Sequence, residues 1–212
     1  MSQRLIYIMD PMCSWCWGFA PVLDAIQTVH PDLRMDLVAG GLRPGVTDPM
    51  QDAARQALAE HWQAVREASG QPLLDPDALP AGFIYNTEPA CRALVVAREL
   101  DADRAWALVK AIQGAFYGQL RDVTQCSVLA DLAEQVGYSR SSFRQALVAE
   151  TAIAAVQADF GWVAGLGISG FPTLLAERDG MLALLSNGYQ PAEGILALLQ
   201  RWVEAGKGAV AE

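Results

Sequence analysis

The sequence is poor in charged residues and has no concentration of positive charge. Charged side chains make up 18% of the 212 residues, and 24 Asp and Glu outnumber 15 Lys and Arg, for a formal net charge of −9. A nucleic-acid-binding surface needs clustered Lys and Arg to neutralise phosphates, and an anionic membrane surface repels a protein of this charge. The composition therefore argues against nucleic acid and membranes as partners.

The sequence also lacks a long apolar segment. The apolar run at residues 5–9 stops at Asp10 and Pro11, so it is shorter than the ~7–15 residues of a secretory signal core. The longest uncharged stretch, residues 160–176, contains four Gly and Pro172 and falls short of the ~20 apolar residues that span a bilayer. We therefore expect a soluble, cytosolic protein.

Cysteine is scarce, which limits the chemistry that it can support. The chain has four cysteines, at Cys13, Cys16, Cys91 and Cys126. In a reducing compartment a disulfide framework is uncommon, whereas a closely spaced pair is typical of catalysis or metal binding. A zinc site would need two more ligands, and the other two cysteines and the two histidines are not paired at short ligand spacing. The pattern favours redox chemistry and predicts no metal site.

Hydrophobic periodicity at the N-terminus predicts a compact strand–helix–strand unit. Hydrophobic residues make up 52% of the chain, which is typical of a protein with a substantial core. Residues 5–9 and 34–39 predict buried strands, and residues 13–29 predict a helix that is kinked at Pro21. Two strands joined by a helix in this way pair in parallel.

The middle of the chain has no strand signal. Six helices are expected, at residues 49–69, 88–99, 102–119, 125–137, 140–149 and 151–164, with a Pro-rich loop at 70–87. After this block, residues 173–177 and 181–185 flank an Arg-Asp-Gly turn and predict a β-hairpin, followed by a helix at 191–205. The order predicts an α/β fold with four strands, interrupted by a helical insertion.

The Cys13-Ser14-Trp15-Cys16 motif begins where the first predicted strand is followed by a helix. A sulfur at a helix N-terminus faces unpaired N–H groups and the positive end of the helix dipole, which stabilise a thiolate and make it nucleophilic. The second sulfur is one helical turn away and can close a disulfide ring. The motif in this position predicts a dithiol–disulfide redox centre.

Two motifs resemble the DsbA-like family of thioredoxin-fold proteins, in its cytosolic, FrnE-like branch. They are Tyr-Ile-Met-Asp-Pro-Met-Cys-Ser-Trp-Cys-Trp-Gly at residues 7–18 and Gly-Phe-Pro-Thr at residues 170–173. The resemblance implies a thioredoxin-like domain at residues 1–47 and 165–212 and a helical insertion domain at 48–164. It also implies a thiol–disulfide oxidoreductase or isomerase acting on protein or small-molecule thiols and disulfides, with glutathione as a candidate partner and no cofactor besides its own disulfide.

The resemblance also implies which residues form the site. Cys13 and Cys16 would react, and Pro172 would be a cis proline opposite them. The residues assigned to substrate binding are Ser14, Trp15, Trp17 and Phe171. The backbone of Phe171 would pair with an extended peptide, and one of the two tryptophans would rim the site while the other packs in the core.

The sequence departs from the thioredoxin pattern around the motif. Tyr7 stands where many thioredoxin-like proteins keep a buried acid, and Asp10 is only three residues before Cys13, which leaves acid assistance to Cys16 open. The motif contains no histidine, so stabilisation of the thiolate rests more on backbone amides. Cys91 and Cys126 lie in helical patterns and are expected to be buried small hydrophobic residues.

Two other functions remain open from the sequence. Glutathione-dependent isomerases and transferases of the kappa and 2-hydroxychromene-2-carboxylate type share this order of elements but use Ser at the position of the first cysteine. A non-catalytic adaptor with a vestigial motif would be expected to lose one cysteine or the proline. Here Cys13, Cys16 and Pro172 are all present.

Overall fold

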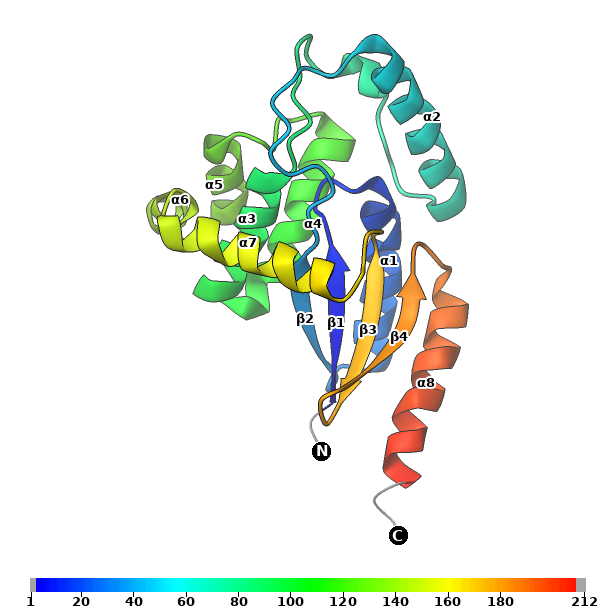
Figure 1. Ribbon diagram of the computed structural model, residues 1–212. Helices are drawn as coiled ribbons and strands as arrows, with labels where there is room; N and C mark the ends of the chain where they lie inside the picture. Colours follow the sequence, from blue (N-terminus) through cyan, green and yellow to red (C-terminus); the bar gives the residue numbers. More distant parts are fainter. Residues whose placement is uncertain (1–2, 209–212) are drawn as a thin grey trace.

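A mixed four-stranded sheet organises the computed structural model, which describes residues 3–208 (Figure 1). The strand order is β2-β1-β3-β4, in which β1 pairs in parallel with β2 and antiparallel with β3. The strands are β1 (Gln3–Met9), β2 (Arg34–Ala39), β3 (Thr173–Arg178) and β4 (Met181–Asn187). The predicted α/β class and thioredoxin-like order are confirmed, because the two ends of the chain form one sheet around a helical insertion.

Both faces of the sheet are covered, which explains why β1 is a continuous apolar run. Leu5, Tyr7 and Met9 point into the larger core beneath α1 (Ser14–Val29) and α8 (Ala192–Gly208). Ile6 and Ile8 point to the opposite face, where they pack beneath Val163. A strand buried on both faces needs apolar residues at every position. Figure 1 shows α1 and α8 on one face and α7 across the other.

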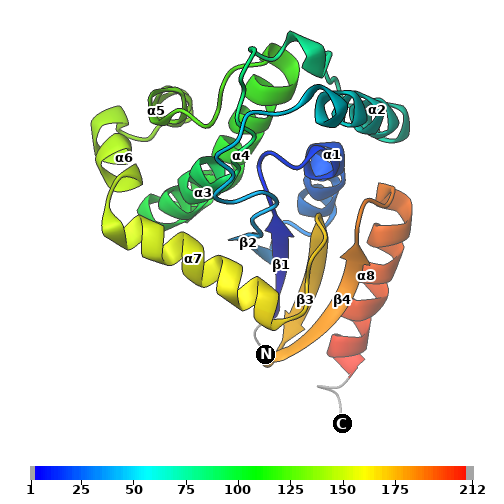
Figure 2. The ribbon, with the colours of Figure 1, turned by 45° about the horizontal axis from the view of Figure 1, so that its top comes forward.

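The six expected helices are all present between β2 and β3, with ends shifted by a few residues. They are α2 (Asp52–Ser69), α3 (Glu88–Leu100), α4 (Ala102–Gln119), α5 (Cys126–Gln135), α6 (Arg140–Leu147) and α7 (Glu150–Gly165). A single 3₁₀ turn at Pro76–Ala78 interrupts the Pro-rich loop. Figure 2 shows α2 above the N-terminus of α1. The exact division of the chain into two domains stays a prediction.

An ion pair fastens the insertion to the edge of the sheet. Arg98 of α3 donates to both carboxylate oxygens of Asp159 on α7, each at 3.0 Å. The same pair binds the outer side of β2, because Arg98 donates to the Leu37 carbonyl oxygen and Asp159 accepts the Ala39 N–H. The insertion is therefore anchored at the last residue of β2, directly before the loop that leads into the site.

The length and hydropathy of the helices bear on whether any of them could span a membrane. Among residues 3–208, no single helix is long and apolar enough to cross a bilayer. The consecutive helices α6 and α7 meet the length and composition criteria together, with a bend of 66° between them. In the structure α7 packs against α3, α6 and β2.

Candidate active site

The two cysteines of the motif lie at the start of α1, at the carboxyl end of β1. Cys13 is the N-cap residue, and its carbonyl oxygen accepts the N–H groups of Cys16 and Trp17 at 3.0 and 3.1 Å. The exposed fraction is 5% for Cys13 and 0% for Cys16, and both thiols are free. Cys13 therefore keeps a small exposed surface, whereas Cys16 has none.

The loop before β3 lies against the first sulfur. The peptide bond between Phe171 and Pro172 is cis, and the Cys13 thiol donates to the Phe171 carbonyl oxygen at a Sγ–O distance of 3.6 Å. On the other side, the Phe171 ring packs over Gly40, where an added Cβ would lie 2.2 Å from the ring. The two sequence motifs, 158 residues apart, thus meet at one point of the fold.

Asp10 is completely buried beneath the turn that presents Cys13. Its carboxylate accepts the N–H of Met12 at 2.8 Å and the N–H of Leu42 at 2.6 Å. Its carbonyl oxygen accepts the N–H of Cys13 at 2.9 Å. One side chain therefore holds the turn before the nucleophile and ties it to the loop after β2.

The insertion reaches the same carboxylate. The Thr87 hydroxyl and the Cys91 thiol are side-chain hydrogen-bonding neighbours of Asp10. Burial raises the pKa of the Asp10 carboxyl, and these hydrogen bonds partly oppose the shift. Burial also raises the pKa of Cys91, and the Asp10 charge adds to that rise. Cys91 is buried as expected, but its thiol faces a carboxylate that the sequence did not place there.

Cys16 occupies a deeper and less polar position. Burial raises the pKa of its thiol, and the neighbouring Cys13 thiol and the Asp10 charge raise it further, while the Asp10 backbone lowers it. Tyr7 of β1 lies next to it, with its ring stacked on Phe19 at a centroid distance of 5.8 Å. Cys16 therefore stays protonated at neutral pH unless another group stabilises its thiolate.

Two buried tyrosines of the insertion adjoin the nucleophile. The Tyr85 hydroxyl donates to the carbonyl oxygen of Met12, the residue before Cys13, at 2.5 Å. Tyr117 of α4 is next to Tyr85, and burial raises the pKa of both hydroxyls. Sequence reasoning missed both residues, because nothing in the local pattern distinguishes them from core aromatic residues.

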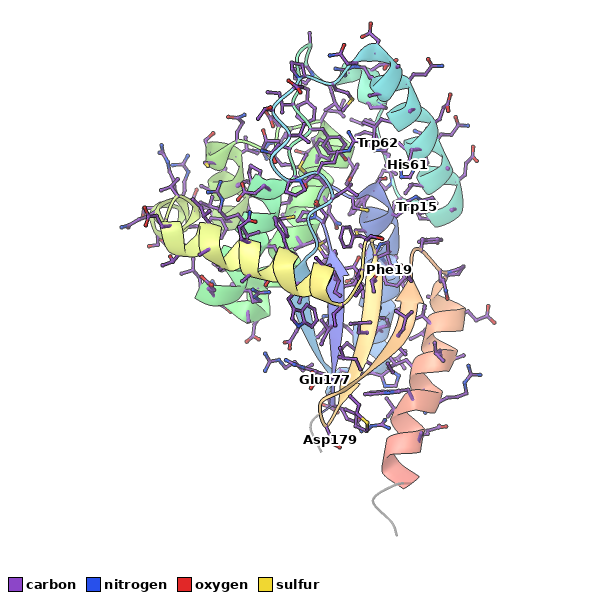
Figure 3. All side chains as sticks on the ribbon, viewed as in Figure 1. Trp15, Phe19, His61, Trp62, Glu177 and Asp179 are labelled. Carbon is purple, nitrogen blue, oxygen red and sulfur yellow. The ribbon has the colours of Figure 1, made fainter. Side chains whose placement is uncertain are left out.

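Helix α2 covers the exposed side of the motif. Figure 3 shows Trp15 of α1 and His61 of α2 next to each other, with their ring centroids 5.8 Å apart and their planes perpendicular. Tyr189 flanks Trp15 on its other side at 5.4 Å. Partial burial lowers the pKa of His61. His61 is exposed on α2, and its ring covers one side of Trp15.

Trp17 packs against the insertion, although it is not fully buried. Its ring stacks on Tyr117 at 6.2 Å, and its Nε1–H donates to the Pro72 carbonyl oxygen at 2.9 Å. The Trp17 carbonyl oxygen has no helical partner four residues on, because Pro21 has no N–H, and it accepts the side chain of Gln71 at 3.2 Å. Trp15 and Trp17 are both half-buried, so they do not divide clearly into one rim tryptophan and one core tryptophan.

Two further residues considered in the sequence, Ser14 and Cys126, differ in their burial. Ser14 is 4% exposed, so its side chain faces the protein interior in this structure. Cys126 is half-buried at the first position of α5, which corrects the expectation that it is buried. Within residues 3–208, no three His, Cys, Asp or Glu side chains lie close enough to hold a metal ion.

Solved structures similar to this chain share both its fold and its length. A candidate protein disulfide isomerase from Nitrosomonas europaea is 38% identical, aligns over 97% of this chain and 99% of its own, and superposes with a TM-score of 0.91. The cytosolic disulfide reductase DsbM from Pseudomonas aeruginosa is 28% identical over 95% of this chain and 99% of its own, with a TM-score of 0.79. DsbM is also known in a structure with GSH. A 2-hydroxychromene-2-carboxylate isomerase, at 15% identity and a TM-score of 0.66, shares the fold alone.

Curated relatives and a family model complete the comparison. The ClpXP adapter protein SpxH from Bacillus subtilis is 23% identical over 91% of this chain, and the chain spans 66% of the length of that protein. The model of the DSBA-like thioredoxin domain matches residues 4–200. That match covers nearly the whole chain, from β1 into α8, and so includes both motifs and the helical insertion. The chain belongs to the DSBA-like thioredoxin domain family.

Proposed function

We propose that this protein is a thiol–disulfide oxidoreductase that works through the dithiol and disulfide forms of Cys13 and Cys16. The observation that carries the proposal is the position of Cys13. Its sulfur is at the N-terminus of α1, next to the Phe171 carbonyl oxygen and Pro172, with Cys16 one turn behind it. The helix N-terminus is a position that favours a thiolate, and Cys16 provides a second thiol to release the product.

The reaction follows from this geometry in two exchanges. The Cys13 thiolate attacks a substrate disulfide, so that a Cys13–substrate bond forms and the substrate S–S bond breaks, releasing one substrate thiolate. Cys16 then gives up its proton and attacks the Cys13 sulfur, which forms the Cys13–Cys16 disulfide and releases the second substrate thiol. Two electrons pass to the substrate, and the reverse sequence oxidises a dithiol.

The substrate is proposed to be a peptide or a small thiol such as glutathione. The likeness to DsbM, a cytosolic disulfide reductase known with GSH, supports glutathione as a partner and the cytosol as the compartment. The half-buried Phe171, whose carbonyl oxygen faces Cys13, would pair with an extended peptide. Trp15, with His61 and Tyr189 beside it, would form an apolar platform for the chain next to the reacting sulfur.

The same observations support two alternative functions less well. An isomerase of the 2-hydroxychromene-2-carboxylate type is supported by the fold alone, and this chain has Cys13 where that class uses Ser. An adaptor role is favoured by the SpxH relatives, which are named as adapters of ClpXP. An adaptor does not require a nucleophile beside the Pro172 loop, although a redox-active protein can also bind partners.

A redox titration against glutathione, read by trapping free thiols, tests the proposal. The wild-type protein should show one reversible two-electron transition, and Cys13→Ser and Cys16→Ser should each abolish it. The midpoint potential then tells whether the protein donates or accepts electrons in the cytosol. Absence of a transition in the wild type, with glutathione binding retained, would overturn the redox assignment in favour of an isomerase or transferase.

A further inference from the structure

The hydroxyl of Tyr7 is a buried polar group without a regular hydrogen bond. Tyr7 has an exposed fraction of 0%, and its hydroxyl oxygen finds no hydrogen-bond partner among the described residues. Its ring is held on two sides, by stacking on Phe19 and by an edge contact with Trp106 at 6.2 Å. The hydroxyl therefore cannot turn to solvent, although leaving such a donor unpaired is unfavourable.

Cys16 lies in the same buried cluster as Tyr7, one turn of α1 before Phe19, the residue on which the Tyr7 ring stacks. Burial raises the pKa of Tyr7, and the neighbouring Cys16 sulfur raises it further. Cys13 contributes more weakly from the same helix. Around Cys16 itself, the ionisable groups are Cys13 on α1 and Asp10 at the end of β1. Asp10 already accepts the backbone N–H groups of Met12 and Leu42, so its carboxylate is committed to the turn.

We propose that Tyr7 is a catalytic residue that donates a hydrogen bond from its hydroxyl to the Cys16 thiolate during resolution of the mixed disulfide. The proposal rests on the redox function proposed above and assigns to β1 the role that a buried acid would otherwise have. A thiol sulfur accepts a hydrogen bond weakly, and a hydrogen bond to the ionised sulfur is much stronger. The hydroxyl would therefore act only when Cys16 has lost its proton.

The hydrogen bond from Tyr7 acts at one point in the resolution of the mixed disulfide. In the mixed disulfide Cys13 is bonded to the substrate sulfur, and Cys16 is a buried thiol. Its proton leaves for solvent, and the sulfur then attacks Cys13, so that the Cys13–Cys16 bond forms and the substrate leaves as a thiolate that takes up a proton. Tyr7 transfers no proton in this scheme; it stabilises the charge on Cys16 between the two events.

The variant Tyr7→Phe removes the hydroxyl and keeps the ring that packs on Phe19. The probe is oxidised glutathione mixed rapidly with the reduced protein, and the Cys13–glutathione mixed disulfide is followed by acid quenching and mass spectrometry. Formation of the mixed disulfide should keep its wild-type rate. Its resolution should slow by about tenfold or more at neutral pH, because loss of the hydrogen bond raises the pKa of Cys16 and lowers the fraction of its thiolate.

The pH profile separates this role from a structural one. In Tyr7→Phe the resolution rate should reach its plateau at a higher pH than in the wild type, and the two rates should converge where Cys16 is ionised in both. Tyr138→Phe is the matched control. It also removes one tyrosine hydroxyl, but this hydroxyl donates to the carbonyl oxygens of Ala97 and Asp101 in the insertion. It should leave both rates unchanged.

The outcomes distinguish this inference from the proposed function. A wild-type protein that forms no Cys13 mixed disulfide would contradict the redox function itself. Equal resolution rates and pH profiles for the wild type and Tyr7→Phe, with a normal redox cycle, would overturn the role of Tyr7 alone. If both exchange steps slow equally in Tyr7→Phe, the hydroxyl supports the fold around α1 and not the Cys16 thiolate, and the inference is wrong.

Discussion

Cys13 and Cys16 are three residues apart on one helix, yet their surroundings are built from different parts of the molecule. Cys13 is next to the loop before β3, through Phe171, and its turn is held by Asp10 and by Tyr85 of the insertion. Cys16 is enclosed by β1 and α1, with Tyr7 of β1 beside it. The first sulfur thus depends on distant segments, whereas the second depends on the local strand–helix unit.

This difference separates the two chemical tasks. In the proposed function Cys13 has to meet substrates, and its surroundings come from loops and from the insertion. In the proposed function Cys16 reacts only with Cys13, so an enclosed environment is sufficient for it. The comparison predicts that changes near Cys13 alter attack and substrate choice, while changes near Cys16 alter release.

The largest difference in exchange activity is expected between the two serine variants. Cys13→Ser should abolish exchange with oxidised glutathione, because no nucleophile remains at the exposed end of the motif. Cys16→Ser should keep the first exchange and accumulate the Cys13–glutathione mixed disulfide, which mass spectrometry detects as one added glutathione. Accumulation in Cys13→Ser instead would reverse the assignment of nucleophile and resolving thiol.

A large effect on stability is expected at Asp10. Asp10→Asn replaces one acceptor oxygen by a donor, so that the N–H of Met12 or Leu42 loses its buried partner. We expect the free energy of unfolding to fall by about 1–3 kcal/mol at pH 7, measured by urea unfolding of both reduced proteins. Alkylation of Cys13 should change more than alkylation of Cys16, since the turn before Cys13 loosens. An unchanged stability would show that the carboxylate does not hold this turn.

The stability difference between the wild type and Asp10→Asn should depend on pH, and the direction of the change can be predicted. Burial raises the folded-state pKa of Asp10 above its value of 3.8 in an unfolded chain. The native state then binds more protons than the unfolded state between these two values, so this group adds stability as the pH falls through that window. The stability difference between the wild type and Asp10→Asn should therefore grow from pH 7 toward pH 4. A difference that shrinks over this range would mean that the folded-state pKa is lowered.

A smaller effect is expected on the Phe171 side of Cys13. Gly40→Ala places a Cβ 2.2 Å from the Phe171 ring, which must move away. Because the ring is half-buried and can shift, we expect a loss of only about 1 kcal/mol in stability, with a severalfold lower rate of peptide disulfide reduction. Gly161→Ala on α7 is the control, since its Cβ would meet no atom within 4 Å. Equal rates in the two variants would remove Phe171 from substrate binding.

The smallest effect is expected at the rim. His61→Ala removes the edge contact with Trp15 but leaves the exposed surface of α2 otherwise intact. Stability should change by less than about 0.5 kcal/mol, and the KM for a peptide disulfide should rise by about two- to threefold with an unchanged kcat. Gln63→Ala on the same helix serves as the control. A change in kcat without a change in KM would argue that His61 acts on the chemistry instead of on binding.

The sequence predicted the elements well where local pattern decides them. Residues 34–39 were predicted exactly as β2 is observed, and the Arg-Asp-Gly turn correctly separated β3 from β4. The two motifs also pointed to the segments that meet at Cys13. Local pattern could not predict which distant residues meet around Asp10: Leu42 reaches it from the loop after β2, and Thr87 and Cys91 reach it from the start of α3. The same holds for Tyr85, whose hydroxyl bonds the residue before the nucleophile from 73 positions away.

The ion pair between Arg98 and Asp159 has a further consequence, for how this protein can meet other copies of itself. A sheet can grow at its borders, because an outermost strand exposes backbone groups that a foreign strand can bind. At the β2 border, the outward carbonyl of Leu37 and the N–H of Ala39 are already occupied by this pair. Strand addition there would first have to break it, so β4 is the border at which uncontrolled β-pairing can begin.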